Sequence, residues 1–259
     1  MPMTAFYFQS TARSADGLQR SGNEDSAFIS GQLIAVADGM GGHAGGEVAS
    51  RIAIQTMQQL APVLTNHDID SDSIEDLLLN SLHTIDNQIN DYVEEAPEVR
   101  GMGTTLTALL LVKDKAALLH VGDSRCYRLR GNNLEQLSND HTVIQELLDQ
   151  GAITQSEVID HPQRSVLTQA LMGHGNVVPV LQLYDVKQKD RFLICSDGLS
   201  GVLTEKEIKI LLKKTDGASA VKTLVEATYV NGAPDNVTVI VADISTEIIS
   251  VNELLGAAQ

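Results

Sequence analysis

The sequence predicts an α+β fold of four layers, in which two antiparallel sheets pack face to face and a pair of helices covers each outer side. Three observations favour this α-β-β-α sandwich. Short apolar strands follow one another across tight turns, as at Lys113-Asp114-Lys115 and at 131–133. Two long helical segments separate the first strands from the middle ones, and two more precede the last strand. Strands and helices do not alternate one by one, as they do in a doubly wound parallel fold.

The spacing of apolar residues sets the bounds of the expected elements. Strands are expected at 6–15, 26–30, 33–37, 104–112, 116–121, 126–129, 134–137, 178–186, 191–195 and 237–244. Helices are expected at 46–60, 74–95, 204–213 and 218–229. Pro62 and Pro97 should end the first two helices, and Thr204 with Glu207 forms a capping box for the third.

Domain organisation follows from the same patterns. The chain has 259 residues, about the length of one large domain. We expect a single catalytic domain over 1–245, with a polar surface excursion, a flap, at about 139–172. Residues 246–259 are expected to form a frayed C-terminal tail.

Composition excludes several classes of partner. The formal net charge of −16 argues against nucleic acid or an anionic membrane surface, because both would be repelled. No run of about 18 apolar residues occurs, so no membrane span is expected. Cys126 and Cys195 lie in apolar strand-like segments with no further cysteine to pair with. They predict reduced, buried thiols and a cytoplasmic protein.

A glycine-rich stretch follows the strand expected at 33–37. This strand ends on Asp38, and residues 39–46 contain five glycines and His43. Without Cβ atoms, such a segment lets a ligand approach the backbone. In one interpretation Asp38 binds a hard metal ion and His43 transfers a proton. In the other, 39–44 is a Gly-x-Gly-x-x-Ala dinucleotide fingerprint, but the first acid after Glu47 is Asp68, which lies beyond the next helix.

Aspartates recur beside glycines at the ends of strands. Asp38, Asp123 and Asp197 each follow an apolar run, and Asp235 stands just before the last strand. Any one Asp-Gly pair is usually an ordinary turn, but four in equivalent places indicate a shared site. Carboxylates that converge in a cleft need cations to remain ionised. Oxygen ligands without a His or Cys cluster suit Mg²⁺ or Mn²⁺.

At this point the chain resembles a known family, the metal-dependent Ser/Thr protein phosphatases of type 2C (PPM) in their bacterial form. The matching motifs, in family order, are Arg20-x-x-x-Glu24-Asp25, Val36-Ala37-Asp38-Gly39-Met40-Gly41-Gly42-His43, Gly101-Met102-Gly103-Thr104-Thr105, His120-Val121-Gly122-Asp123-Ser124-Arg125, Cys195-Ser196-Asp197-Gly198-Leu199 and Asp235-Asn236-Val237-Thr238. The family fold is the α-β-β-α sandwich.

The resemblance implies a centre with two Mn²⁺ or Mg²⁺ ions. Asp38 would bridge the ions, and the Gly39 carbonyl, Asp197 and Asp235 would complete their protein ligands. Two ions that share a water lower its pKa and direct it at phosphorus. The family therefore hydrolyses phosphoserine and phosphothreonine by direct attack of water, without a phosphoenzyme.

Further roles come from the same resemblance. Arg20 would bind the phosphate, and Glu24 and Asp25 would orient the waters on the metals. His43 is a candidate general acid for the leaving oxygen, and a solvated loop histidine is the alternative. Asp123 with Asp197 and the flap residue Ser165 implies a third, weaker ion.

Some of these residues and motifs have alternative interpretations. Ser165 could instead cap a helix, and Thr104 with Thr105 could serve the fold alone. Cysteine-dependent phosphatase chemistry needs Cys-x₅-Arg, which neither Cys126 nor Cys195 provides. A catalytically inactive phosphatase-like binding module is the alternative function, but it predicts missing ligands, and all the main aspartates are present.

Partners follow from the implied activity. Phosphorylated Ser/Thr proteins are the expected substrates, a Ser/Thr kinase is the expected opponent, and the protein is expected to be a monomer. The acidic surface predicts a preference for phosphosites flanked by basic residues.

Overall fold

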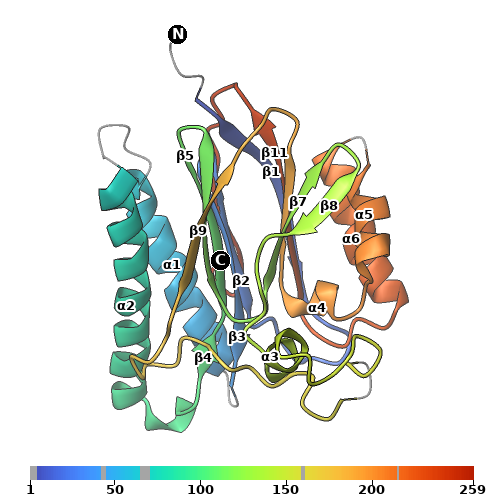
Figure 1. The fold of residues 1–259 in the computed structure, drawn as a ribbon. Coiled ribbons are helices and arrows are strands. Elements are labelled where there is room, and N and C mark those ends of the chain that lie inside the picture. The colour runs from blue at the N-terminus through green and yellow to red at the C-terminus, as the bar shows by residue number, and fades with distance from the viewer. Residues whose placement is uncertain (1–4, 42–44, 65–70, 159–160, 215) are drawn as a thin grey trace.

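The computed structural model describes residues 5–41, 45–64, 71–158, 161–214 and 216–259. It is a sandwich of two antiparallel sheets with helices on both outer sides (Figure 1). The predicted four-layer α+β fold is therefore confirmed. In Figure 1, α1 and α2 cover one sheet, and α5 and α6 cover the other.

The larger sheet has the order β12-β2-β3-β5-β6-β9, with β4 paired to β3. Its strands are β2 (Asp25–Ser30), β3 (Leu33–Met40), β4 (Gly103–Thr104), β5 (Leu106–Val112), β6 (Lys115–Val121), β9 (Val180–Asp185) and β12 (Asn252–Gly256). The smaller sheet has the order β1-β11-β10-β7-β8. Its strands are β1 (Tyr7–Ala15), β11 (Val237–Ser245), β10 (Arg191–Cys195), β7 (Arg125–Arg130) and β8 (Asn133–Gln136).

Helices occupy three regions. The larger sheet is covered by α1 (Gly45–Leu64) and α2 (Ser71–Glu95), after which the 3₁₀ turn η1 (Pro97–Val99) leads into β4. The smaller sheet carries α4 (Asp197–Ser200), α5 (Glu205–Leu212) and α6 (Gly217–Val230). The segment 139–172 contains α3 (Val143–Asp149) and passes over the open end of the sandwich (Figure 1).

Alternation along β3 shows how the layers are built. Ile34 and Val36 belong to the core between the two sheets, whereas Leu33, Ala35 and Ala37 pack against α1 and α2. Successive side chains of a strand point to opposite faces, so a strand buried on both faces is apolar throughout. β3 is therefore a central strand, and the residues that follow it emerge at the end of the sheet.

The core between the sheets includes an aromatic pair. Phe8 of β1 and Phe192 of β10 meet edge to face, with ring centroids 6.2 Å apart and planes at 82°. This geometry is favourable for aromatic rings. Cys126 and Cys195 are buried, unpaired thiols, as expected, and burial raises the pKa of Cys195 to about 12.

Two expectations about element ends are wrong. Pro62 lies inside α1, which continues to Leu64. A proline in the last turn costs the helix one backbone N–H, but its fixed φ is compatible with the helical conformation. The expected frayed tail contains β12, which pairs with β2 in register. Leu255 of this strand is buried, and the Ala257 N–H donates to the Asp25 carbonyl at 2.8 Å. The capping box of Thr204 and Glu207 is present as predicted.

Candidate active site

The end of β3 places Asp38 at the open end of the larger sheet. Its N–H donates to Thr105 Oγ1 at 3.0 Å, and its carbonyl accepts from the Thr105 N–H at 2.9 Å. The same carbonyl accepts from Thr104 Oγ1 at 3.0 Å. Both threonines are buried. They fix the backbone of Asp38 from the neighbouring strand, so the direction of its carboxylate is set by the sheet.

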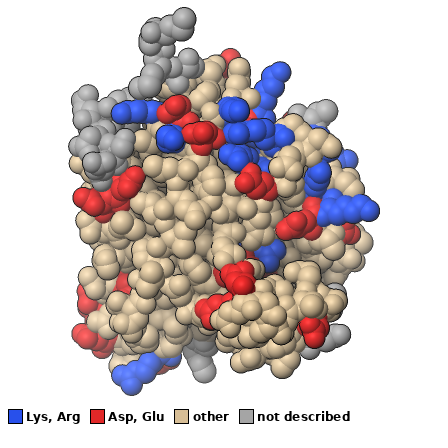
Figure 2. Space-filling view, in the orientation of Figure 1, with Lys and Arg blue, Asp and Glu red and all other residues tan. Residues whose placement is uncertain are grey.

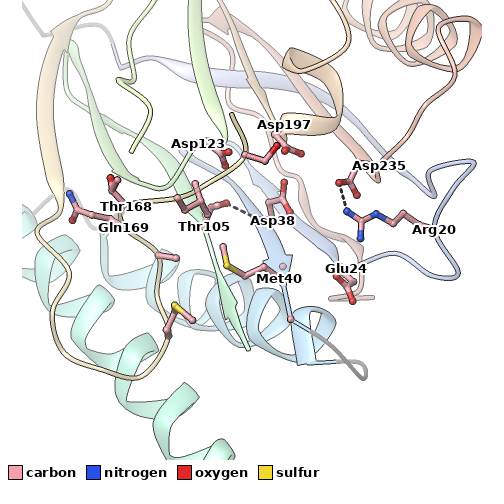
Figure 3. Close-up of a pocket in the computed structure, with 16 residues that line it drawn as sticks. Arg20, Glu24, Asp38, Met40, Thr105, Asp123, Thr168, Gln169, Asp197 and Asp235 are labelled. Atoms are coloured by element: carbon pink, nitrogen blue, oxygen red, sulfur yellow. Dashed lines mark hydrogen bonds and ion pairs between the residues drawn. The ribbon is translucent and has the colours of Figure 1, made fainter. Parts of the chain in front are cut away.

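A cleft of about 500 Å³ opens at this point. It is lined by Arg20, Glu24, Asp38, Gly39, Met40, Gly41, Thr105, Asp123, Ser165, Leu167, Thr168, Gln169, Ala170, Met172, Asp197 and Asp235. Eight of these residues, from Arg20 to Asp235, are candidates from the sequence. In Figure 3 Asp38, Asp123 and Asp197 gather at the centre, while Thr168 and Gln169 stand on the opposite wall.

Two candidates remain. Asp25 is buried beneath the cleft, where its Oδ2 accepts a hydrogen bond of 2.8 Å from Ser196 Oγ. It faces Asp38 across the β2–β3 pair. His43 falls outside the described residues.

Close backbone approaches explain two of the glycines. A Cβ on Gly39 would lie 2.2 Å from the Gly46 carbonyl oxygen, at the start of α1. A Cβ on Gly198 would lie 1.8 Å from the Asn236 carbonyl oxygen, next to Asp235. Only glycine allows such contacts. Gly39 therefore lets the end of β3 approach the start of α1, and Gly198 lets α4 approach the residue before β11.

Burial dominates the electrostatics of the aspartates. It raises the pKa of Asp123 to about 7, with Asp197 adding repulsion. It also raises the pKa of Asp25 to about 7, although the hydroxyls of Thr238 and Ser196 oppose the shift. For Asp38, burial followed by repulsion from Asp25 and Asp197 raises the pKa well above its ordinary value. These carboxylates become stable anions only beside positive charge.

One cation of the cleft lies at its rim. Arg20 Nη2 is 2.5 Å from Asp235 Oδ2, and both side chains are partly exposed. This hydrogen bond is the main cause that raises the pKa of Arg20, so the guanidinium stays charged. Arg125, whose motif contains Asp123, instead makes a forked contact with Asp140 at 2.7–3.0 Å.

The donor set fits hard divalent ions that retain water. Within the described residues, no three His, Cys, Asp or Glu side chains are placed to hold one ion together. Ions bound here would take carboxylate and carbonyl oxygens together with waters, which is the coordination that Mg²⁺ favours. Buried carboxylates with raised pKa values fit such ions, because the ions supply the missing positive charge.

Comparison with known proteins identifies the family. The family model described as protein phosphatase 2C matches residues 20–233. The chain belongs to the protein phosphatase 2C family. Serine/threonine protein phosphatase PstP of Mycobacterium tuberculosis is 42% identical over 236 residues, which are 90% of this chain and 44% of that protein. Serine/threonine phosphatase stp of Listeria welshimeri is 34% identical over 89% of this chain and 94% of its own length.

Solved structures of the protein phosphatase 2C family agree with the fold. The crystal structure of the M. tuberculosis phosphatase PstP/Ppp has a TM-score of 0.85 at 40% identity and covers 92% of this chain and 98% of its own. The catalytic domain of PstP, solved in complex with two manganese ions, has a TM-score of 0.84 at 39% identity, covering 92% and 99%. The chain thus spans less than half of full-length PstP but nearly all of its solved domain.

Two contacts near Asp123 could not be predicted from the sequence. The Gly122 N–H donates to His141 Nδ1 at 3.1 Å, and the His141 N–H donates to the Gly122 carbonyl at 2.8 Å. His120 is fully buried, and its Nε2 donates to the Asn139 carbonyl at 3.0 Å. These residues attach the start of the 139–172 segment to the cleft. His120 stands in the Gly-Asp motif, but nothing local to it points to 139–141.

Charge is unevenly spread over the surface. Figure 2 shows Lys and Arg gathered at one end of this face, over the turns that join β5 to β6 and β9 to β10. Lys113, Lys115, Lys187 and Lys189 are exposed there. This end is remote from β4 and α4, where the cleft opens (Figure 1). None of the described helices is both long enough and apolar enough to cross a membrane.

Proposed function

We propose that this chain is a metal-dependent protein serine/threonine phosphatase that hydrolyses phosphoserine and phosphothreonine. One observation carries the proposal: aspartates from four separate strand ends line one cleft, and burial raises the pKa of most of them. The names of the relatives support the same activity. The manganese ions in the PstP structure support the choice of metal.

The ions would be Mn²⁺ or Mg²⁺. Asp38, the Gly39 carbonyl, Asp197 and Asp235 would hold two of them, and Asp123 with Asp197 and Ser165 would form a third, weaker site. All these residues line the cleft. When bound, two such ions lower the pKa of a water and so supply the nucleophile for in-line attack on phosphorus.

The remaining residues bind and orient. Arg20 stands at the rim with a guanidinium whose fork matches phosphate oxygens, and Asp235 holds it in place. Glu24 lines the cleft, where its carboxylate would orient the waters on the metal ions. Asp25 lies deeper and fixes the base of the site through Ser196.

The leaving oxygen needs a proton. His43 is our candidate general acid on sequence grounds, because histidine is the side chain that most often transfers a proton in such steps. The test is the pH dependence of kcat for His43→Gln with a phosphoserine peptide, which is an alkyl phosphate. An aryl phosphate, whose phenolate leaves without help, should be affected less.

The setting of the enzyme is proposed on the same basis. Its opponent is a Ser/Thr kinase, and it acts as a monomer on phosphorylated proteins, through one catalytic domain in which 139–172 is a flap over the cleft. The unpaired, buried cysteines support a reducing compartment such as the cytoplasm. Positive flanking residues of a substrate would meet an acidic cleft, whereas the lysines gather at the far end (Figure 2).

The decisive experiment is hydrolysis of p-nitrophenyl phosphate and of a phosphothreonine peptide, with Mn²⁺ and with EDTA. We expect turnover with Mn²⁺ alone and none from Asp38→Asn. The matched control is Asp114→Asn, an exposed aspartate in the β5–β6 turn, which should behave as wild type. Turnover in EDTA would refute the metal mechanism, and no turnover under any condition would favour an inactive binding module.

A further inference from the structure

Asp86, on α2, lies outside the cleft and binds three backbone amides of a distant loop. Its Oδ1 accepts from the N–H groups of Met172 at 3.0 Å and Gly173 at 2.7 Å. Its Oδ2 accepts from the Gly175 N–H at 2.6 Å. The side chain is 5% exposed. Three backbone N–H groups on one buried carboxyl group make this a strong attachment.

The loop has the shape that this contact requires. Gly173 has a φ of +78° and Gly175 a φ of +67°, conformations that other residues rarely adopt. A Cβ on Gly173 would lie 2.8 Å from the Asn90 nitrogen, in the next turn of α2 after Asp86. Both the backbone conformation and the close approach therefore demand glycine. Successive N–H groups in such a turn form an anion-binding concavity, and here the anion is a side chain of α2.

The same loop is bound on its other side to β4, the strand that pairs with β3 next to Asp38. The Leu171 N–H donates to the Thr104 carbonyl at 2.9 Å, and the Thr104 N–H donates to the Leu171 carbonyl at 3.0 Å. Thr104 Oγ1 in turn donates to the Asp38 carbonyl. Ala170 and Met172 line the cleft. A continuous chain of hydrogen bonds thus runs from α2 through one wall of the cleft to the backbone of Asp38.

We propose that Asp86 is a positioning residue for the phosphatase reaction. By holding Met172 and Gly173, it fixes the wall formed by 169–172, which faces the aspartates across the cleft. This inference rests on the proposed function. In this proposal the chain of a phosphopeptide passes this wall, whereas a small aryl phosphate stays beside Arg20 and the aspartates. Asp86 therefore sets how well the cleft accepts a peptide.

Asp86→Asn tests the proposal with little change of volume. The asparagine oxygen can still accept from Met172 and Gly173, but its NH₂ group would face the Gly175 N–H, donor against donor. We expect kcat/KM for a phosphoserine peptide, relative to that for p-nitrophenyl phosphate, to fall about tenfold, mainly through KM. This is the effect of losing one hydrogen bond to a charged group. Asp91→Asn makes the same chemical change on the exposed side of α2 and should leave the ratio unchanged.

Hydrogen exchange provides a readout that does not depend on activity. In Asp86→Asn the amides of Met172, Gly173 and Gly175 should exchange faster, while those of β5 should not change. An unchanged ratio of the two kcat/KM values would overturn the proposal, and so would equal losses on both substrates, which would indicate general destabilisation. If wild-type protein hydrolyses neither substrate, the proposed function fails, and the exchange rates alone decide whether Asp86 holds the loop.

Discussion

Asp25 and Asp38 lie directly opposite one another on β2 and β3, with Asp25 buried and Asp38 half-buried at the cleft. Like charges that face each other across a strand pair destabilise a sheet. Here repulsion from Asp25 is the second largest cause, after burial, of the raised pKa of Asp38. Repulsion between these two carboxylates therefore lowers the free energy of unfolding of the metal-free protein, and this loss can be measured.

Asp38→Asn should separate activity from stability. Hydrolysis of p-nitrophenyl phosphate with Mn²⁺ should fall by more than the roughly 10–100-fold that follows loss of a residue supporting a metal ligand. In EDTA, calorimetry should show a higher Tm than wild type, by about 2–4 °C for each kcal/mol of relieved repulsion. Asp114→Asn is the control. A lower Tm for Asp38→Asn in EDTA would contradict this view of the cluster.

In the metal-free protein, the contribution of Asp123 to stability should fall as the pH rises. Asp123 has a pKa of about 7 when folded, against about 3.9 in an unfolded chain, so the folded state binds the extra proton between these values. Its contribution to stability is therefore complete below about pH 4 and is lost as the pH rises through 7. Urea unfolding in EDTA should show Asp123→Asn gaining on wild type by up to a few kcal/mol across this range. A constant difference from pH 4 to pH 8 would refute the raised pKa.

His120 should act in the opposite direction. Burial, followed by repulsion from His141, lowers its pKa to about 3, so the folded state excludes a proton that the unfolded state binds below about pH 6.5. Its contribution is present above pH 6.5 and is lost as the pH falls toward 3. His120→Gln should unfold more easily at pH 7.5, by about 1–3 kcal/mol, because Thr107 Oγ1 and the Asn139 carbonyl lose their partner. The difference between its urea midpoint and that of wild type should nevertheless shrink between pH 6.5 and pH 4, and a constant difference would disprove the assignment.

Arg20→Ala should weaken phosphate binding with little effect on folding. KM for p-nitrophenyl phosphate and the inhibition constant of inorganic phosphate should each rise about tenfold or more, as expected for lost hydrogen bonds to a charged group. The ion pair with Asp235 is half exposed, so the free energy of unfolding should change by less than about 1 kcal/mol. Arg100→Ala removes an exposed arginine and serves as the control. Unchanged inhibition by phosphate would remove Arg20 from the site.

Local patterns were sufficient for most of the fold. The strand expected at 191–195 is β10, because a short apolar run between polar residues has few alternatives. β12 was missed because Asn252–Gly256 has only two apolar residues and obtains its pairing from β2, more than 200 positions earlier. α4 has four residues, fewer than a periodic signal needs.

The residues of the site likewise fall into those that a local sequence signal marks and those that none marks. Asp38, Asp123, Asp197 and Asp235 could be found because each stands beside a strand end with a glycine or proline, a local sign. Asp86 could not, since nothing near it in a long helix marks it and its partners follow 86 to 89 positions later. His120 has a local motif, but its contact with 139 depends on how that segment returns over the sheet.

The pairing of β12 with β2 has a practical consequence for anyone who shortens this chain. Removing residues 252–259 would make β2 an edge strand, with unpaired backbone N–H and C=O groups exposed to solvent. Such edges recruit strands from other molecules. The truncated protein should therefore self-associate, and an apparent loss of activity after truncation would reflect aggregation rather than loss of a catalytic residue.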